Sequence, residues 1–138
     1  MGNFAYLVED NNKAVAATIT PSTEDTLYLR ANLVTLPVAK TFRTTSKTGQ
    51  DILFDLGSAL AIDLVAIVNH NMSTSATITV KAGTTSATTD FSQAMTARLT
   101  DAFVLLSSTQ TYRYWKIEVA DASISDAFIE IGYVLIGD

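Results

Sequence analysis

Alternating apolar and polar residues in the second half of the chain predict antiparallel β-strands. In residues 114–119 three large apolar residues alternate with two charged ones: Trp115, Ile117 and Val119 against Lys116 and Glu118. Residues 76–81 repeat the alternation, with Ile78 and Val80 on the apolar face. Because successive side chains of a strand point to opposite faces, each segment is expected to place one face on a core and the other in water.

Two further segments are apolar for most of their length. Residues 62–68 are apolar at both parities after Asp63, so we expect a central strand that is covered on both faces. Residues 128–136 predict a long last strand, in which Gly132 marks a bulge or the close approach of another backbone. Shorter strands are expected at residues 27–31, 41–44, 51–55 and 103–106, and a single helical turn or a loop at residues 92–99.

Turn signals separate these segments at short intervals. Clusters rich in Gly, Asn, Ser and Asp occur at residues 46–49, 56–58, 69–73, 82–84 and 121–126. About eight short strands broken by such turns are typical of an antiparallel β-sandwich of the jelly-roll kind rather than of an α/β fold. The sequence therefore predicts one all-β domain over residues 1–138, with residues 1–20 as an N-terminal arm that lies on a neighbour.

Composition and charge exclude several classes of partner. The chain is 48% hydrophobic and 17% charged, carries a net charge of -5 and has no cysteine. Its nine Lys and Arg residues are scattered, whereas nucleic acids and anionic membranes select gathered basic side chains, so neither is an expected partner. The first ten residues do not resemble a secretory signal, and no apolar run approaches the length that spans a membrane.

The one histidine, His70, is the first candidate for chemistry. It stands in the string Asn69-His70-Asn71, directly after the predicted central strand. As a functional residue it would be a general base or a metal ligand, but a zinc site is ruled out because the chain has no cysteine and no second histidine. We therefore expect the side chains of this string to bond to the backbone of a turn, which is a structural role.

Carboxylates are the second candidate. Five aspartates stand near predicted strand ends and turns: Asp51, Asp55, Asp63, Asp121 and Asp126. Paired carboxylates can perform acid–base catalysis or hold Ca²⁺. Solvated strand ends explain the positions better, and a structural Ca²⁺ stays open as an alternative. No catalytic, cofactor-binding or metal-ligating residue is assigned, and the protein is predicted not to be an enzyme.

The aromatic residues raise the hypothesis of a sugar platform, because rings stack on the apolar face of a sugar. Trp115 lies on the inward face of its strand, so we expect it in the core. Tyr112 and Tyr114 have the opposite parity, and Phe42 and Arg43 stand beside a predicted loop, where a ligand or a partner can reach them. Ordinary packing is the simpler interpretation for each of these residues.

Two stretches resemble discoidin-like domains, the galactose-binding-like jelly rolls related to the C-type domains of coagulation factors 5 and 8. The first is Asp51-Ile-Leu-Phe-Asp-Leu-Gly-Ser-Ala-Leu-Ala-Ile-Asp-Leu-Val-Ala-Ile-Val-Asn-His-Asn71, and the second joins residues 112–119 to residues 128–137. In addition, Phe42-Arg43-Thr44-Thr45 stands where many members carry a Trp-Arg-Ser-like string. The resemblance implies a galactose-binding-like jelly roll.

Within that family, the strings Val68-Asn69-His70-Asn71 and Glu130-Ile131-Gly132 resemble versions from virion proteins of tailed bacteriophages. This resemblance implies a non-enzymatic structural component of a virion, in the head, neck or tail. Such a protein is made in the host cytoplasm, contacts capsid or tail subunits and assembles as a homo-oligomer or in many copies. A Thr-rich, charge-poor surface suits this function because its burial costs little desolvation. The alternative function is a carbohydrate-binding module for host-surface sugars.

Overall fold

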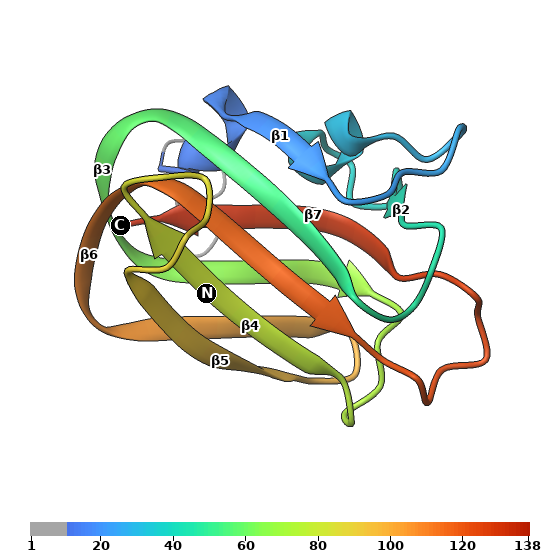
Figure 1. Cartoon of the computed structure of the whole chain (residues 1–138). Coiled ribbons are helices and arrows are strands. Elements are labelled where there is room, and N and C mark those ends of the chain that lie inside the picture. The colour runs from blue at the N-terminus through green and yellow to red at the C-terminus, as the bar shows by residue number, and fades with distance from the viewer. Residues whose placement is uncertain (1–10) are drawn as a thin grey trace.

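The computed structural model describes residues 11–138, which form seven β-strands and two short 3₁₀-helices (Figure 1). The helices are η1 (Lys13–Ala16) and η2 (Arg30–Val34). The strands are β1 (Thr18–Pro21), β2 (Phe42–Arg43), β3 (Gln50–His70), β4 (Thr77–Gly83), β5 (Phe91–Ala97), β6 (Asp101–Ala120) and β7 (Glu130–Gly137). No helix in this part of the chain is long and apolar enough to cross a membrane.

Two long strands, β3 and β6, take part in both layers of a sandwich. They pair with each other along both of their halves, and each curves from one layer into the other at the left of Figure 1. The first layer contains β1, the first half of β3, the second half of β6, and β4. The second layer contains β2, β7, the second half of β3 and the first half of β6, and β5 pairs with strands of both layers. Every pairing is antiparallel, so the predicted jelly-roll sandwich is confirmed.

The core between the layers is built by the residues that alternate in the sequence. The three apolar residues of β6, Trp115, Ile117 and Val119, are at most 2% exposed. Ile78 and Val80 of β4 are each 1% exposed. Full burial of an apolar side chain of this size contributes about 1.5–3 kcal/mol. The period of two therefore identifies the inward face of both strands.

The second half of β3 is the central strand of the second layer, as its uninterrupted apolar run predicts. It lies between β6 and β7, and Val65 and Ile67 are fully buried in the main core. The close backbone approach predicted at Gly132 is also confirmed. A Cβ atom at that position would collide with the carbonyl oxygen of Val38 and with the side chain of Asn69.

The expected helical turn at residues 92–99 is wrong, because these residues are mostly strand. β5 continues to Ala97, with Met95 and Ala97 buried while Thr96 is exposed. Pairing with β4 and β6 decides the conformation here. The small and polar residues of this segment have only a weak intrinsic preference for any secondary structure, so pairing with the neighbouring strands overrides that preference.

The expected strand at residues 27–31 is also wrong. Two acidic side chains bond to the backbone there: Asp25 accepts from the Leu27 N–H at 2.8 Å, and Glu24 accepts from the Arg30 N–H at 2.5 Å. Such local bonds offer the backbone an alternative to a strand ladder. The segment is therefore a loop that runs into η2.

The expected turn at residues 56–58 does not end a strand. β3 runs through it, with a register shift against β6 between Asp55 and Leu60. Gly57 has a φ of 81°, and its N–H donates to Asp55 Oδ1 at 2.8 Å. The turn signal is thus used to bend one strand between the layers instead of separating two strands.

Asn12 closes the open edge of β7. β2 pairs with β7 only at Glu130 and Ile131, so the rest of that edge needs other partners. The side chain of Asn12 donates to the Val134 carbonyl at 2.8 Å and accepts from the Ile136 N–H at 3.0 Å. Residues 11–20 thus pack on their own chain, whereas residues 1–10 of the predicted arm lie outside the described residues.

Candidate functional site

Four loops meet at one end of the sandwich, on the right of Figure 1, and we call this region the loop end. It consists of residues 22–29, 44–49, 71–76 and 121–129. The N–H of Thr45 donates to Thr23 Oγ1 at 3.0 Å, which joins the first two loops. Asp121 joins the others: its N–H donates to the Lys47 carbonyl at 2.8 Å, and its carboxylate accepts from the Ser73 N–H at 2.6 Å. The C-terminus lies at the opposite end.

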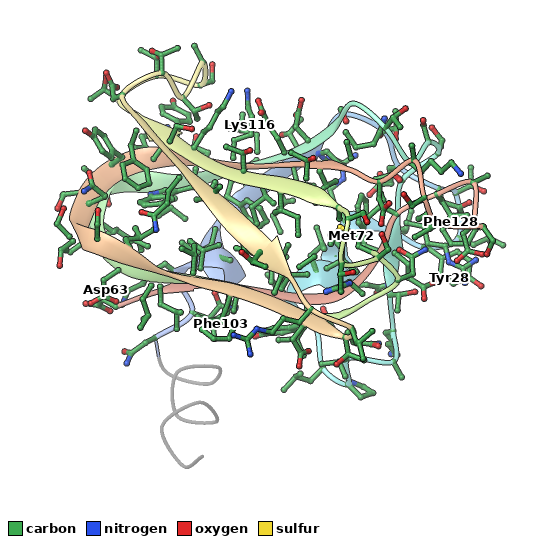
Figure 2. The ribbon with its side chains drawn as sticks, turned by 90° about the horizontal axis from the view of Figure 1, so that it is seen from below. Tyr28, Asp63, Met72, Phe103, Lys116 and Phe128 are labelled. Atoms are coloured by element: carbon green, nitrogen blue, oxygen red, sulfur yellow. The ribbon has the colours of Figure 1, made fainter. Side chains whose placement is uncertain are left out.

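Arg43 lies against two aromatic rings at the loop end. Its guanidinium carbon is 3.7 Å from the centroid of the Tyr28 ring and 4.5 Å from that of Phe128. Figure 2 shows both rings at this end of the molecule. A guanidinium over an aromatic face is attracted by about 0.5–2 kcal/mol. We call Tyr28, Arg43 and Phe128 the Arg43 stack.

Glu130 forms an ion pair with the guanidinium of the Arg43 stack. Its Oε2 accepts from Arg43 Nε at 2.5 Å, and the two side chains are 27% and 25% exposed. Burial lowers the pKa of Arg43, but the Glu130 carboxylate outweighs it and holds this pKa above its usual range. Among residues 11–138 the side-chain hydrogen bonds of Arg43 use Nε alone, so its two terminal amino groups have no hydrogen-bond partner there.

Asn71 holds the loop that carries Phe128 and Glu130. Its Oδ1 accepts from the Glu130 N–H at 2.8 Å. Its Nδ2 donates to the Phe128 carbonyl and to Asp126 Oδ2, both at 3.0 Å. One side chain therefore fixes the backbone on both sides of residue 129.

His70 precedes Asn71 and is only 6% exposed. Its Nδ1 accepts a hydrogen bond from the Met72 N–H at 3.0 Å, as the sequence string leads us to expect. Its Nε2 is buried and makes no hydrogen bond of good geometry in residues 11–138. Burial lowers the pKa of His70, although a weak hydrogen bond to the Asp101 backbone and the charges of Asp101 and Asp121 oppose this shift.

Asp121 is a structural anion at the base of the loop end. It is 2% exposed, and its carboxylate accepts from the N–H groups of Ser73 and Ser123. Burial raises the pKa of Asp121, but these hydrogen bonds and the charge of Lys47 outweigh burial and hold the pKa below its usual range. Both oxygens thus serve to hold loops together.

The other aspartates are dispersed. Asp55 pairs with Arg113 at 2.7 Å, which lowers the pKa of Asp55 to about 2. Asp51 lies on the outer face of the first layer, and Figure 2 shows Asp63 at the end away from Tyr28. No three His, Cys, Asp or Glu side chains in residues 11–138 lie close enough to hold a metal ion. The structural Ca²⁺ alternative therefore finds no set of ligands in this part of the chain.

Of the aromatic candidates, Trp115 and Phe42 are fully buried. Trp115 Nε1 donates to the Tyr112 carbonyl at 3.1 Å. The Tyr114 ring is contacted by Arg113, 5.0 Å from its centroid, at the end where β3 bends. These rings are core or lie far from the loop end.

Two surface hollows lie away from the Arg43 stack. One of about 340 Å³ on the first layer is lined by Asp51, Thr79 and Glu118 among others, without any aromatic ring. The other, of about 650 Å³, lies between β3 and the β5–β6 turn, beside Leu99 and Phe103. Leu99 is 82% exposed, so this second hollow is the apolar one. Neither combines two rings with a charged group.

The sequence identified Arg43 as a residue that a ligand can reach, but it missed Tyr28 and Phe128. The sequence pattern predicts a strand at Tyr28, which lies in a loop, and it includes Phe128 in the last strand, which begins only at Glu130. Residues 28 and 128 are separated by 100 positions, and no local pattern links them. Their contact depends on the paths of two loops.

No protein-family model and no curated protein matches this chain. Solved structures do match its fold. Chitosan-binding module 1 of a chitosanase/glucanase from Paenibacillus sp. IK-5 has a TM-score of 0.74 at 13% identity, covering 92% of this chain and 98% of that chain. A fucose-binding module from Streptococcus pneumoniae has a TM-score of 0.73 at 15% identity, covering 94% and 96%.

The family 32 carbohydrate-binding module of C. perfringens NanJ, in complex with galactose, has a TM-score of 0.70 at 14% identity, covering 93% of this chain and 98% of that one. These neighbours show that the fold is the discoidin-like, galactose-binding-like jelly roll, which the sequence resemblance implied.

The predicted function of a virion structural protein is wrong on these comparisons. The structural neighbours are carbohydrate-binding modules and lectin domains, which fit the alternative reading of the sequence. A charge-poor, Thr-rich surface does not distinguish an assembly subunit from a small binding module, and this is why the prediction failed. The predicted homo-oligomer and the location in a virion stay untested predictions.

Proposed function

We propose that this protein binds carbohydrate at the loop end, through the Arg43 stack. The observation that carries the proposal is the placement of two aromatic rings and one guanidinium by segments far apart in the sequence. Arg43 covers one face of each ring, so the opposite faces are the ones that a sugar can stack on with its C–H groups. Charged groups make strong hydrogen bonds to sugar hydroxyls. The fold supports the proposal, since similar structures include modules named for binding fucose and chitosan and a family 32 carbohydrate-binding module in complex with galactose.

The polar groups around the stack suit a neutral or amino sugar. The two terminal amino groups of Arg43 have no hydrogen-bond partner in residues 11–138, and the carboxylates of Asp25 and Asp126 lie on loops that flank Arg43. Carboxylates accept hydrogen bonds from sugar hydroxyls or from a sugar ammonium group. Because the whole chain carries a net charge of -5, acidic sugars are disfavoured.

The loop end is held in place before any ligand arrives. The Asp25 N–H donates to the Arg43 carbonyl at 2.9 Å, and the Arg43 N–H donates to the Tyr28 carbonyl at 3.1 Å. On the other side, Asn71 fixes the backbone of Phe128. A site that is ordered in advance loses less conformational entropy on binding.

The domain acts by binding, without catalysis. Two groups at the base of the loop end that resemble a general acid or base are already used: His70 is buried against the Met72 backbone, and Asp121 is tied to two serine N–H groups. Neither presents a free atom to a sugar at the surface. Carbohydrate-binding modules among the structural neighbours support this part of the proposal.

The test is titration of the full chain with galactose, fucose and chitotriose, followed by calorimetry or by NMR shifts. Arg43→Ala is expected to lower the affinity at least about tenfold, since it removes the contacts to both rings and the donors to the sugar. Arg113→Ala is the matched control, because Arg113 also pairs with a carboxylate and contacts a ring, but at the other end. If Arg43→Ala and Arg113→Ala bound the sugars with equal affinity, the Arg43 stack would not be the binding site.

A further inference from the structure

His70 occupies an unusual position beneath the loop end. It is the one histidine of the chain, it is 6% exposed, and its Nε2 makes no hydrogen bond of good geometry in the described residues. It begins the turn that contains Asn71 and Met72, and Figure 2 shows Met72 on the side of the loop end. Because the ring is buried and its Nδ1 is already used as an acceptor, a second proton on it is costly.

We propose that His70 makes carbohydrate binding at the loop end sensitive to acid: a proton on its Nδ1 breaks the hydrogen bond from Met72 and loosens the Arg43 stack. This inference rests on the proposed function for its ligand. The change in the turn itself follows from the described contacts alone.

The proton chemistry is fixed by the hydrogen bond that His70 accepts. Nδ1 accepts from the Met72 N–H, so in the neutral ring the single proton is on Nε2. A second proton can go only to Nδ1, where it would point at the N–H of Met72. Two donors then face each other, and the bond between them is lost. Protonation therefore changes the turn directly.

The turn is connected to the Arg43 stack through Asn71. Asn71 lies between His70 and Met72, and its side chain holds the backbone of Phe128 and Glu130. Phe128 contributes a ring to the stack, and Glu130 holds Arg43 by its Nε. A movement of the turn thus reaches both groups that fix Arg43 through a single side chain.

The groups that face His70 come from three elements. β6 contributes Asp101 and the loop after β6 contributes Asp121, whose own charge is balanced by Lys47 of the loop before β3. β7 contributes only the backbone carbonyl of Glu130, which accepts from the Asn71 N–H, because the Glu130 carboxylate is bonded to Arg43. Asp101 and Asp121 favour a charged ring, but burial outweighs them and keeps the pKa of His70 below its usual range. The ring is therefore neutral near neutral pH and takes its proton only in acid.

The experiment follows the single histidine by NMR in the full chain between pH 8 and pH 5. We expect the Nε2–H tautomer, a pKa below about 6.5, and movement of the amide signals of Asn71 and Phe128 with the same midpoint. In parallel, the affinity for the best of galactose, fucose and chitotriose is measured across this range. The wild type is expected to lose at least about fivefold in affinity.

His70→Asn is the matched variant. Its Oδ1 can accept from the Met72 N–H as in an Asx turn but does not titrate, so its affinity is expected to stay constant over the same range. If His70→Asn does not fold, Asp101→Asn replaces it. Loss of that negative charge is expected to move the midpoint to lower pH.

The outcomes separate the two proposals. The role of His70 would be overturned if the sugar affinity of the wild type and that of His70→Asn depended equally on pH. It would also be overturned if the amide signals of Asn71 and Phe128 did not shift with the titration of the histidine. If no sugar binds at any pH but these signals follow His70, the pH-sensitive turn stands and the proposed carbohydrate function fails. If acid weakens sugar binding to the wild type but not to His70→Asn, the result supports both the role of His70 and the carbohydrate function.

Discussion

Asn71 is a half-buried residue that connects two loops of the loop end. It makes three side-chain hydrogen bonds, to Asp126, to the Phe128 carbonyl and from the Glu130 N–H. Two of these bonds satisfy backbone groups, one in the loop before β7 and one at the first residue of β7. A polar group left unsatisfied when its partner is removed costs about 1–3 kcal/mol.

We therefore expect Asn71→Ala to lower the free energy of unfolding by about 2 kcal/mol and to weaken sugar binding. Asn71→Asp is the informative comparison, because its carboxylate still accepts from the Glu130 N–H but no longer donates to Phe128 and repels Asp126. Its stability should lie between those of the wild type and the alanine variant. Urea unfolding at pH 7.5 measures both, and a wild-type stability of Asn71→Ala would contradict the assigned role.

His70 also predicts how stability depends on pH. The folded-state pKa of His70 lies below its usual range, so the unfolded chain binds the proton more readily. The contribution of neutral His70 to the free energy of unfolding is therefore fully present above about pH 6.5. The free energy of unfolding then declines as the pH falls towards the folded-state pKa, by at most about 1.4 kcal/mol per pH unit. Urea unfolding of the wild type and of His70→Asn measures the difference, and parallel profiles above pH 5 would refute it.

At the level of elements, the hydrophobic pattern predicted the strands that pack on two neighbours. β4, the second half of β6 and the second half of β3 follow from their alternation or apolar runs. The hydrophobic pattern did not predict the loops of the candidate site. Residues 27–31 have strand-like composition, but Glu24 and Asp25 fix their backbone as a loop, and this depends on side-chain geometry that no periodicity encodes.

The edge of β7 gives an element-level prediction. Asn12 supplies hydrogen bonds to Val134 and Ile136 where no strand pairs with this edge. Asn12→Ala is expected to destabilise the fold by about 2 kcal/mol, because a buried N–H and a buried carbonyl lose their partner. Asn32→Ala, which removes one part-buried bond to Thr41, is the control and should cost less. Similar losses in thermal melting would contradict the edge-closing role of Asn12.

For the whole molecule, fold and function were predicted with different success. The strand pattern and the sequence resemblance predict the galactose-binding-like jelly roll, and the structure has this fold. Strands that bury one face on a core alternate apolar and polar residues, and this alternation can be recognised in the sequence. The function did not follow, because the Arg43 stack joins residues 28, 43 and 128, and only Arg43 stands near a recognisable string. Function resides in sites carried by a fold, and this site exists only once the loops are in place.

Carbohydrate binding at the Arg43 stack is tested most directly by a calorimetric titration of the full wild-type chain, Arg43→Ala and Arg113→Ala with galactose, fucose and chitotriose at pH 7.5. We expect at least one sugar to bind the wild type and Arg113→Ala with similar affinity, and to bind Arg43→Ala at least about tenfold more weakly. Binding that is unchanged by Arg43→Ala would contradict the proposed site. No binding of any of the three sugars to the wild type would contradict the proposed function.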